Sequence, residues 1–213
     1  MATHAPARLK RAAGLRGIYA ILGEEPRVVS RASSILDGGV RIVQYRAKTG
    51  IIADTLRLLR EITRERHALL IVNDDWRAAI AFDCDGVHLG PEDAGFASIA
   101  TLRTAMPDRL IGLSCGTEKE VRTANESDVD YVGAGSVYAT PSKADAGEPI
   151  GVMGLRALVK ESVVPVAAIG GVSSATIRDV KRTGAAMAAV ISAIASAADA
   201  RRAMRDLIQA WNG

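Results

Sequence analysis

The sequence has few aromatic residues, and this scarcity restricts how its core can be built. Phenylalanine, tryptophan and tyrosine make up 4% of the 213 residues, whereas apolar residues as a whole make up 48%. That apolar share is ordinary for a globular protein, so the core must consist mainly of alanine, valine, isoleucine and leucine. Such residues suit parallel strands buried under helices, and the length fits one domain with a sizeable core.

Cysteine is almost absent, which argues against a disulfide framework. Cys84 and Cys115 are the two cysteines, and they do not form a CxxC motif. We therefore expect two free, buried thiols in a reducing compartment. No apolar run reaches the ~18 residues that a membrane-spanning helix needs. The cytoplasm is the expected location.

Several patterns of chemistry are also missing. The histidines lack metal-ligand spacing, so zinc is not expected, and neither a GxSxG elbow nor a Cys–His nucleophile pattern is present. The net charge of +3 comes from 27 basic and 24 acidic residues. This mild excess suits phosphorylated small molecules, but no basic stripe with interleaved aromatics indicates nucleic-acid binding.

The amino-terminal segment differs in composition from the rest. Residues 1–11 hold four basic side chains when His4 is counted, and no apolar segment of a signal peptide follows them. We interpret residues 1–14 as a flexible tail and residues 15–213 as a single domain.

Short β-rich runs alternate with amphipathic helical stretches along the whole chain. The predicted strands are Gly17–Leu22, Arg41–Arg46, Ala68–Asp74, Gly86–Gly90, Leu110–Cys115, Tyr131–Val137, Pro165–Gly170 and Ala186–Ile191. The predicted helices are Pro26–Gly38, Ile52–His67, Trp76–Cys84, Phe96–Met106, Glu118–Glu126, Val152–Glu161, Ser174–Thr183 and Asp199–Trp211, with Ser173 or Ser174 as the cap of the seventh. This order predicts a compact (β/α)8 TIM barrel. A doubly wound sheet is disfavoured because no glycine fingerprint follows the first strand.

Polar residues and glycines follow the predicted strands at their carboxyl ends, where such barrels place their active sites. Gly170 and Gly171 follow the seventh strand, and Ile191 and Ser192 follow the eighth. Glycine permits close backbone approach, and backbone N–H groups at a helix start attract anions. These loops predict a phosphate site, with a simple tight turn at the two glycines as the alternative.

A second anion site is indicated after the second strand. In an extended backbone, the side chains of Arg46 and Lys48 point the same way. Their planar fork and point charge would suit a diphosphate, and Lys143 could supply a third positive group. A surface salt bridge is the alternative for Arg46 and Lys48.

Two carboxylates, Asp74 and Asp93, follow neighbouring strand units. Carboxylates that lie close together repel one another unless a cation joins them. Near phosphates, Mg²⁺ is the natural cation, so the pair predicts a magnesium site. Acid–base catalysis and loop capping are the alternatives. His88 lies in the fourth strand, and we interpret it as structurally hydrogen-bonded rather than as a catalytic base.

Together these segments resemble the thiamine phosphate synthase family, in order and over nearly the whole barrel. The segments are QYRAK (44–48), IVNDDWRAAIAFDCDGVHLGPED (71–93), IGLSCGT (111–117), YVGAGSVYATPSK (131–143), AIGG (168–171) and AVISAI (189–194). The resemblance implies a transferase that joins hydroxymethylpyrimidine diphosphate to thiazole phosphate, releasing pyrophosphate. It also implies dissociative chemistry, in which the diphosphate leaves first with the help of Mg²⁺.

The resemblance assigns roles to particular residues. The pyrimidine diphosphate would be held by Gln44, Arg46, Lys48, Asn73, Ser114 and Lys143, of which Arg46, Lys48, Ser114 and Lys143 would be catalytic. Asp74 and Asp93 would bind Mg²⁺, and the thiazole phosphate would be bound by Thr140, Ser142, Gly170, Gly171, Ile191 and Ser192. The chain departs from the family pattern in its loops, for example at Asp75, where the family commonly has arginine, and at Pro91, Gly116 and Tyr138.

Two other functions remain open. A thiazole tautomerase shares the barrel, but the resemblance implies that it would lack the second carboxylate and use a histidine where this chain has Cys115 and Gly116. The alternative of a non-catalytic barrel that binds thiamine intermediates is disfavoured by the retention of Asn73, Asp74, Asp93 and Lys143, since binding alone would not need the metal pair. The oligomeric state also stays open, with a homo-oligomer among the alternatives.

Overall fold

The computed structural model describes residues 5–90, 99–140 and 148–213. Its centre is a closed barrel in which eight strands pair in sequence order, from β1 to β8 and back to β1. Every pairing is parallel. The strands are β1 (Gly17–Gly23), β2 (Ile42–Arg46), β3 (Leu69–Asn73), β4 (Gly86–Leu89), β5 (Leu110–Cys115), β6 (Tyr131–Ala134), β7 (Val166–Ala168) and β8 (Met187–Val190).

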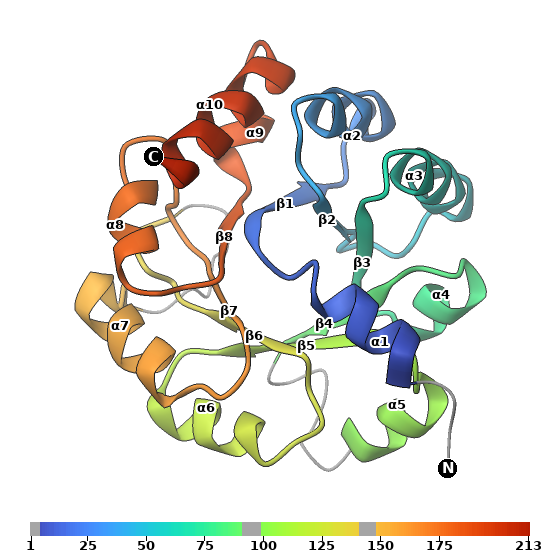
Figure 1. Ribbon diagram of the computed structural model, residues 1–213. Helices are drawn as coiled ribbons and strands as arrows, with labels where there is room; N and C mark the ends of the chain where they lie inside the picture. Colours follow the sequence, from blue (N-terminus) through green and yellow to red (C-terminus); the bar gives the residue numbers. More distant parts are fainter. Residues whose placement is uncertain (1–4, 91–98, 141–147) are drawn as a thin grey trace.

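Helices surround this ring of strands (Figure 1). They are α1 (Ala5–Ala12), α2 (Val28–Asp37), α3 (Ala53–Glu65), α4 (Trp76–Ala81), α5 (Ile99–Ala105), α6 (Glu118–Asn125), α7 (Gly151–Glu161), α8 (Ile177–Arg182), α9 (Ser192–Ala195) and α10 (Ala200–Asn212). The predicted (β/α)8 barrel is therefore confirmed. Over the described residues, no helix is both long and apolar enough to cross a membrane.

Two packing layers follow from the alternation of side chains along the strands. In β1, Ile18, Ala20 and Leu22 belong to a large cluster that also includes the buried faces of the surrounding helices. Tyr19 and Ile21 belong to a second, smaller cluster. Because successive strand residues point to opposite faces, the smaller cluster fills the barrel interior and the larger one lies between strands and helices.

The amino-terminal segment contradicts the expectation of a frayed tail, because it forms α1. Arg8 Nε lies 2.6 Å from Asp130, and Arg11 Nε lies 3.0 Å from Asp85. Asp130 immediately precedes β6 and Asp85 immediately precedes β4, so α1 docks at the amino-terminal ends of the strands. A short helix has little stability of its own, and these ion pairs to distant residues explain why local sequence did not reveal it.

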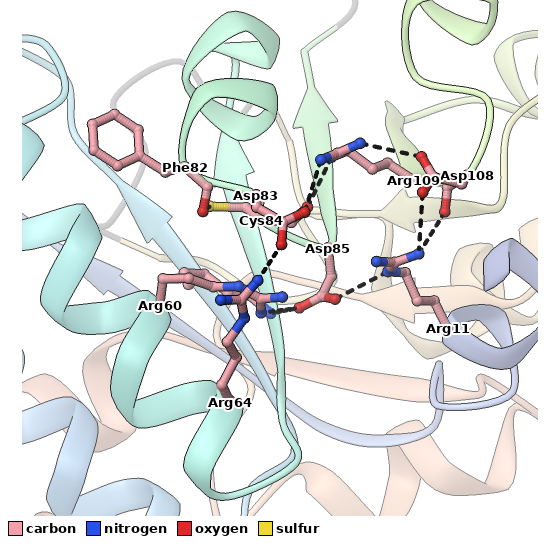
Figure 2. A network of polar contacts seen from close by, with 10 residues as sticks. Arg11, Arg60, Arg64, Phe82, Asp83, Cys84, Asp85, Asp108 and Arg109 are labelled. Carbon is pink, nitrogen blue, oxygen red and sulfur yellow. Dashed lines mark hydrogen bonds and ion pairs between the residues drawn. The ribbon is translucent and has the colours of Figure 1, made fainter.

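Asp85 is the centre of the contacts on this side (Figure 2). It is 7% exposed, and its carboxylate accepts hydrogen bonds from Arg11, Arg60 and the backbone N–H of Leu70. Figure 2 also shows Arg109 beside Asp108 and Asp83. The buried carboxylate is thereby paired and hydrogen-bonded, as burial of a charge requires.

The eighth unit and the seventh helix differ in detail from the prediction. Ser192 begins the short helix α9, which the sequence pattern did not predict. The seventh predicted helix begins at Ile177 rather than at Ser174, and Thr176 is its cap residue. Thr176 Oγ1 accepts a hydrogen bond from the backbone N–H of Ser173. This local turn replaces the serine cap that we expected.

Candidate functional site

A cavity of about 600 Å³ opens at the carboxyl ends of the strands. Its lining combines two groups of the residues predicted from the sequence. The first group is Gln44, Arg46, Asn73, Asp74 and Ser114, and the second is Thr140, Gly170, Gly171, Ile191 and Ser192. The structure therefore brings together ten predicted site residues, which come from β2, β3 and β5 and from the segments that follow β3, β6, β7 and β8.

The first group owes its position to strand alternation. Gln44 and Arg46 are two residues apart on β2, and both share the inward face with Ile42 of the interior cluster. Asn73 is likewise two residues beyond Ile71 on β3. Gln44 is 2% exposed, whereas Arg46 is partly exposed at the rim. The charged group thus lies near solvent and the amide lies deep in the cavity.

Lys48 does not join this group. Strand β2 ends at Arg46, so the extended backbone that would have aligned the two side chains does not reach Lys48. Lys48 is exposed, and its backbone N–H donates to Glu24 at 3.2 Å. The same carboxylate binds both the backbone N–H and the hydroxyl of Thr49. These bonds hold the loop, and Lys48 is not among the cavity-lining residues.

Asp74 lies at the mouth of the cavity in a left-handed backbone conformation, with φ of 62°. Its backbone N–H donates to the carbonyl of His88 at 2.9 Å, and the Asn73 amide donates to its carboxylate. Asp93, Ser142 and Lys143 lie outside the described residues. Within the described part of the chain, no three histidine, cysteine or acidic side chains are grouped to hold a metal ion. The predicted carboxylate pair therefore stays a prediction.

The extra carboxylate beside Asp74 has a structural role. Asp75 is the cap residue of α4, and its Oδ1 accepts a hydrogen bond from the backbone N–H of Ala78 at 2.8 Å. A carboxylate at a helix amino terminus is stabilising. The departure from arginine at this position thus has a local explanation.

The loop after β7 requires glycine. Gly170 has φ of 96°, and a Cβ atom there would lie 1.9 Å from Ser136 Oγ and 2.8 Å from its Cα. Gly170 also accepts a hydrogen bond from the backbone N–H of Tyr138 through its carbonyl. The glycine therefore lets the loops after β6 and β7 pack together at the cavity. Ile191 caps α9 beside them, and Ser192 is its first residue.

Other cavity residues were not found from the sequence. They include Tyr19 on β1, Glu120 on α6, and Ser136 and Glu148 in the segment between β6 and α7. For Tyr19 a signal existed, since it alternates with Ile18 and Ala20 and shares a face with Ile21. Its aromatic ring, however, suits an apolar core equally well. Glu120 has a structural role in the capping box of α6, where Thr117 is the cap residue.

His88 and the two thiols agree with the predictions. His88 contacts the Tyr131 hydroxyl through Nδ1 at 3.1 Å and the Ser114 hydroxyl through Nε2 at 3.0 Å. It is therefore hydrogen-bonded, as expected. Cys84 and Cys115 are free and buried. Burial raises the pKa of each thiol to about 12, so both are protonated at neutral pH.

The closed barrel and its polar cavity define a (β/α)8-barrel protein with a ligand site at the carboxyl ends of its strands. Comparison with known proteins identifies the family. The chain belongs to the thiamine monophosphate synthase family, whose model matches residues 18–194.

Individual relatives agree with this assignment. A thiamine-phosphate synthase of Caldivirga maquilingensis is 38% identical over 203 residues, which cover 92% of this chain and 97% of the relative. One of Archaeoglobus fulgidus is 42% identical over 182 residues, or 84% of each chain. The solved thiamine phosphate pyrophosphorylase of Pyrococcus furiosus superposes with a TM-score of 0.85 at 36% identity, covering 95% of this chain and 98% of that one.

Proposed function

We propose that the protein is a transferase that joins hydroxymethylpyrimidine diphosphate to thiazole phosphate, giving thiamine phosphate and pyrophosphate. The observation that carries the proposal is the composition of the cavity at the carboxyl ends of the strands. Its lining includes amide, guanidinium and hydroxyl groups of β2, β3 and β5, the carboxylate of Asp74 after β3, the glycine loop after β7 and the first residue of α9. Such a cavity suits two phosphorylated substrates held together.

The proposed reaction begins at the diphosphate. The bond between the pyrimidine methylene carbon and the diphosphate oxygen breaks, and the electron pair leaves with pyrophosphate. The thiazole nitrogen then donates its lone pair to the methylene cation. Arg46 would stabilise the departing negative charge, and Lys48 would do so once its loop approaches the ligand. We propose the same role for Lys143. Gln44, Asn73 and Ser114 would orient the diphosphate substrate. The thiazole phosphate would bind Thr140, Ser142, Gly170, Gly171, Ile191 and Ser192.

Magnesium is the proposed cofactor. Asp74 offers a partly hydrogen-bonded carboxylate at the mouth of the cavity, and oxygen ligands of this kind suit Mg²⁺. We propose that Asp74 and Asp93 hold the ion, which would neutralise charge on the diphosphate. The free thiols support a cytoplasmic setting for the enzyme.

One assay tests the proposed reaction. Purified protein with both substrates and Mg²⁺ should release pyrophosphate and form thiamine phosphate in equal amounts. Isomerisation of a thiazole phosphate carboxylate without condensation would instead indicate a tautomerase. Tight binding of the substrates without either reaction would indicate a non-catalytic barrel.

The metal proposal has a matched control. Asp74→Asn and Asp75→Asn make the same chemical change at adjacent exposed aspartates. Asp74→Asn should strongly weaken Mg²⁺ binding, so that turnover needs a higher Mg²⁺ concentration. Asp75→Asn should leave the required Mg²⁺ concentration unchanged because Asp75 caps α4. Asp93→Ala should abolish turnover while the circular dichroism spectrum stays that of the folded protein. Equal Mg²⁺ titrations for the two asparagine variants would contradict the proposed site.

A further inference from the structure

A chain of hydrogen bonds crosses the barrel interior from Gln44 to Ser114. Gln44 Nε2 donates to the Tyr19 hydroxyl at 2.8 Å, and the Tyr19 and Tyr131 hydroxyl oxygens are 2.8 Å apart. The Tyr131 hydroxyl lies 3.1 Å from His88 Nδ1, and His88 Nε2 lies 3.0 Å from Ser114 Oγ. The chain thus connects two cavity-lining residues on β2 and β5 through side chains of β1, β6 and β4.

The Gln44 amide sets the direction of this chain. An amide nitrogen can only donate, so the Tyr19 oxygen accepts. Burial raises the pKa of Tyr19 and of Tyr131 well above the ordinary phenol value, so both phenols keep their protons at neutral pH. Each phenol has one proton to donate, and a buried donor without an acceptor is costly. Tyr19 therefore donates to Tyr131.

The same reasoning continues through the imidazole ring. Once the Tyr131 oxygen accepts from Tyr19, its own proton is directed to His88 Nδ1. A neutral imidazole that accepts at one nitrogen carries its proton on the other. His88 therefore donates from Nε2 to Ser114 Oγ. The single proton of the Ser114 hydroxyl is then available to a hydrogen-bond acceptor in the cavity.

We propose that Tyr131 is a positioning residue that holds His88 in its Nε2–H form, so that Ser114 presents its hydroxyl proton to the substrate. The assignment of the acceptor, an anionic oxygen of a phosphorylated substrate, rests on the proposed function. The tautomer itself does not. Tyr131 acts through His88 and Ser114 and is not among the residues that line the cavity.

The barrel accommodates this arrangement by leaving room for the Tyr131 ring. A Cβ atom at Gly112 would lie 2.1 Å from Cζ of Tyr131. The Tyr131 and His88 rings stack with centroids 5.4 Å apart and an angle of 29° between their planes. The ring positions, and with them the hydroxyl contacts, are thus fixed by packing as well as by hydrogen bonds.

Nitrogen NMR of the ligand-free protein tests the tautomer without any assay of activity. The protein has three histidines, and the signal of His88 is identified by its loss in His88→Gln. We expect the Nε2–H form in the wild type and a mixture of tautomers in Tyr131→Phe, because the donor to Nδ1 is gone. Tyr19→Phe should weaken the preference for the Nε2–H form, since the Tyr131 oxygen could then accept a hydrogen bond from a protonated His88 Nδ1. Tyr45 is a buried tyrosine that does not belong to the chain of hydrogen bonds, so Tyr45→Phe should leave the tautomer of His88 unchanged.

Kinetics test whether the tautomer matters for turnover. Tyr131→Phe should lower kcat about tenfold, with KM for each substrate changed less than about twofold, because a misdirected donor weakens transition-state stabilisation. In a Ser114→Ala background the same substitution should have little further effect, since it acts through Ser114.

Either of two NMR results would overturn the inference: a wild-type His88 protonated on Nδ1, or an unchanged tautomer in both Tyr131→Phe and Tyr19→Phe. If Tyr131→Phe fails to fold, Tyr19→Phe alone decides the matter. Additive kinetic effects of Tyr131→Phe and Ser114→Ala would also contradict it. An inactive wild type would refute the proposed function instead. The NMR experiment would still decide the tautomer of His88, because it does not depend on activity.

Discussion

Arg60 and Asp85 form an ion pair at 2.7 Å near the amino-terminal end of β4, with side chains that are 10% and 9% exposed. Arg60 belongs to α3 and Asp85 precedes β4, so the pair joins an outer helix to the strand ring. Arg11 of α1 contacts the other carboxylate oxygen of Asp85. One carboxylate therefore connects three separate segments.

Asp85→Ala should lower the free energy of unfolding by about 3–5 kcal/mol, because it leaves the Arg60 guanidinium buried without its partner. Urea unfolding followed by circular dichroism measures the change. Asp54→Ala is the control, since the Asp54–Arg57 pair has side chains that are 87% and 57% exposed. An exposed pair contributes at most about 1 kcal/mol. Equal losses in the two variants would contradict the central role of Asp85.

Asp75→Ala should destabilise the protein by about 1 kcal/mol, because it removes the side-chain cap of α4. Asp75→Asn keeps an oxygen acceptor for the backbone N–H of Ala78 and should retain most of that stability. The midpoints of urea unfolding compare the two variants. If asparagine destabilises the protein as much as alanine does, the hydrogen bond is not the source of the effect.

Gly170→Ala should destabilise the protein by about 1–3 kcal/mol through backbone strain alone. It should also raise KM for the thiazole phosphate, because the added methyl group would displace Ser136 at the cavity. Gly23→Ala is the matched control, since a Cβ atom there meets nothing within 4 Å. Thermal unfolding and substrate titrations check both effects. An unchanged KM for the thiazole phosphate in Gly170→Ala would contradict the proposal that the loop after β7 binds the phosphate.

Thiol reactivity should be low in the folded protein and should depend on pH. Burial raises the pKa of Cys84 and Cys115 to about 12, from an ordinary value of 9.0. The thiolate is the reactive form, so at pH 8 iodoacetamide should modify native protein far more slowly than urea-unfolded protein. The same shift favours the folded state below pH 9, and that contribution should be lost as pH rises from 9 towards 12. Mass spectrometry measures the labelling, and rapid native labelling at pH 8 would contradict the raised pKa.

The sequence predicted the barrel because its signals are local and repeated. Each strand is a short apolar run, and each helix carries its own stripe of apolar residues, as Leu56 and Leu59 do on α3. Helix α1 was missed because its main contacts, from Arg8 and Arg11, reach residues about 120 and 74 positions away. No local pattern contains such contacts.

The candidate site was predicted only in part. The position of Gln44, Arg46 and Asn73 at the carboxyl ends of predicted strands placed them correctly at the cavity, since it depends only on where each strand lies in the sequence. Lys48 was misplaced because the point where β2 ends depends on a loop held by Glu24. The hydrogen bonds through Tyr19 and Tyr131 could not be predicted, because they join side chains of five different strands that meet only when the eight-stranded barrel closes.

The docking of α1 divides the molecule into two ends that can change independently. The arginines of α1 reach aspartates at the amino-terminal ends of β4 and β6, whereas the cavity lies at the opposite ends of the strands. Substitutions in the cavity loops therefore leave these ion pairs untouched. A library that varies substrate preference should concentrate on those loops, and one that seeks heat resistance should concentrate on the α1 side.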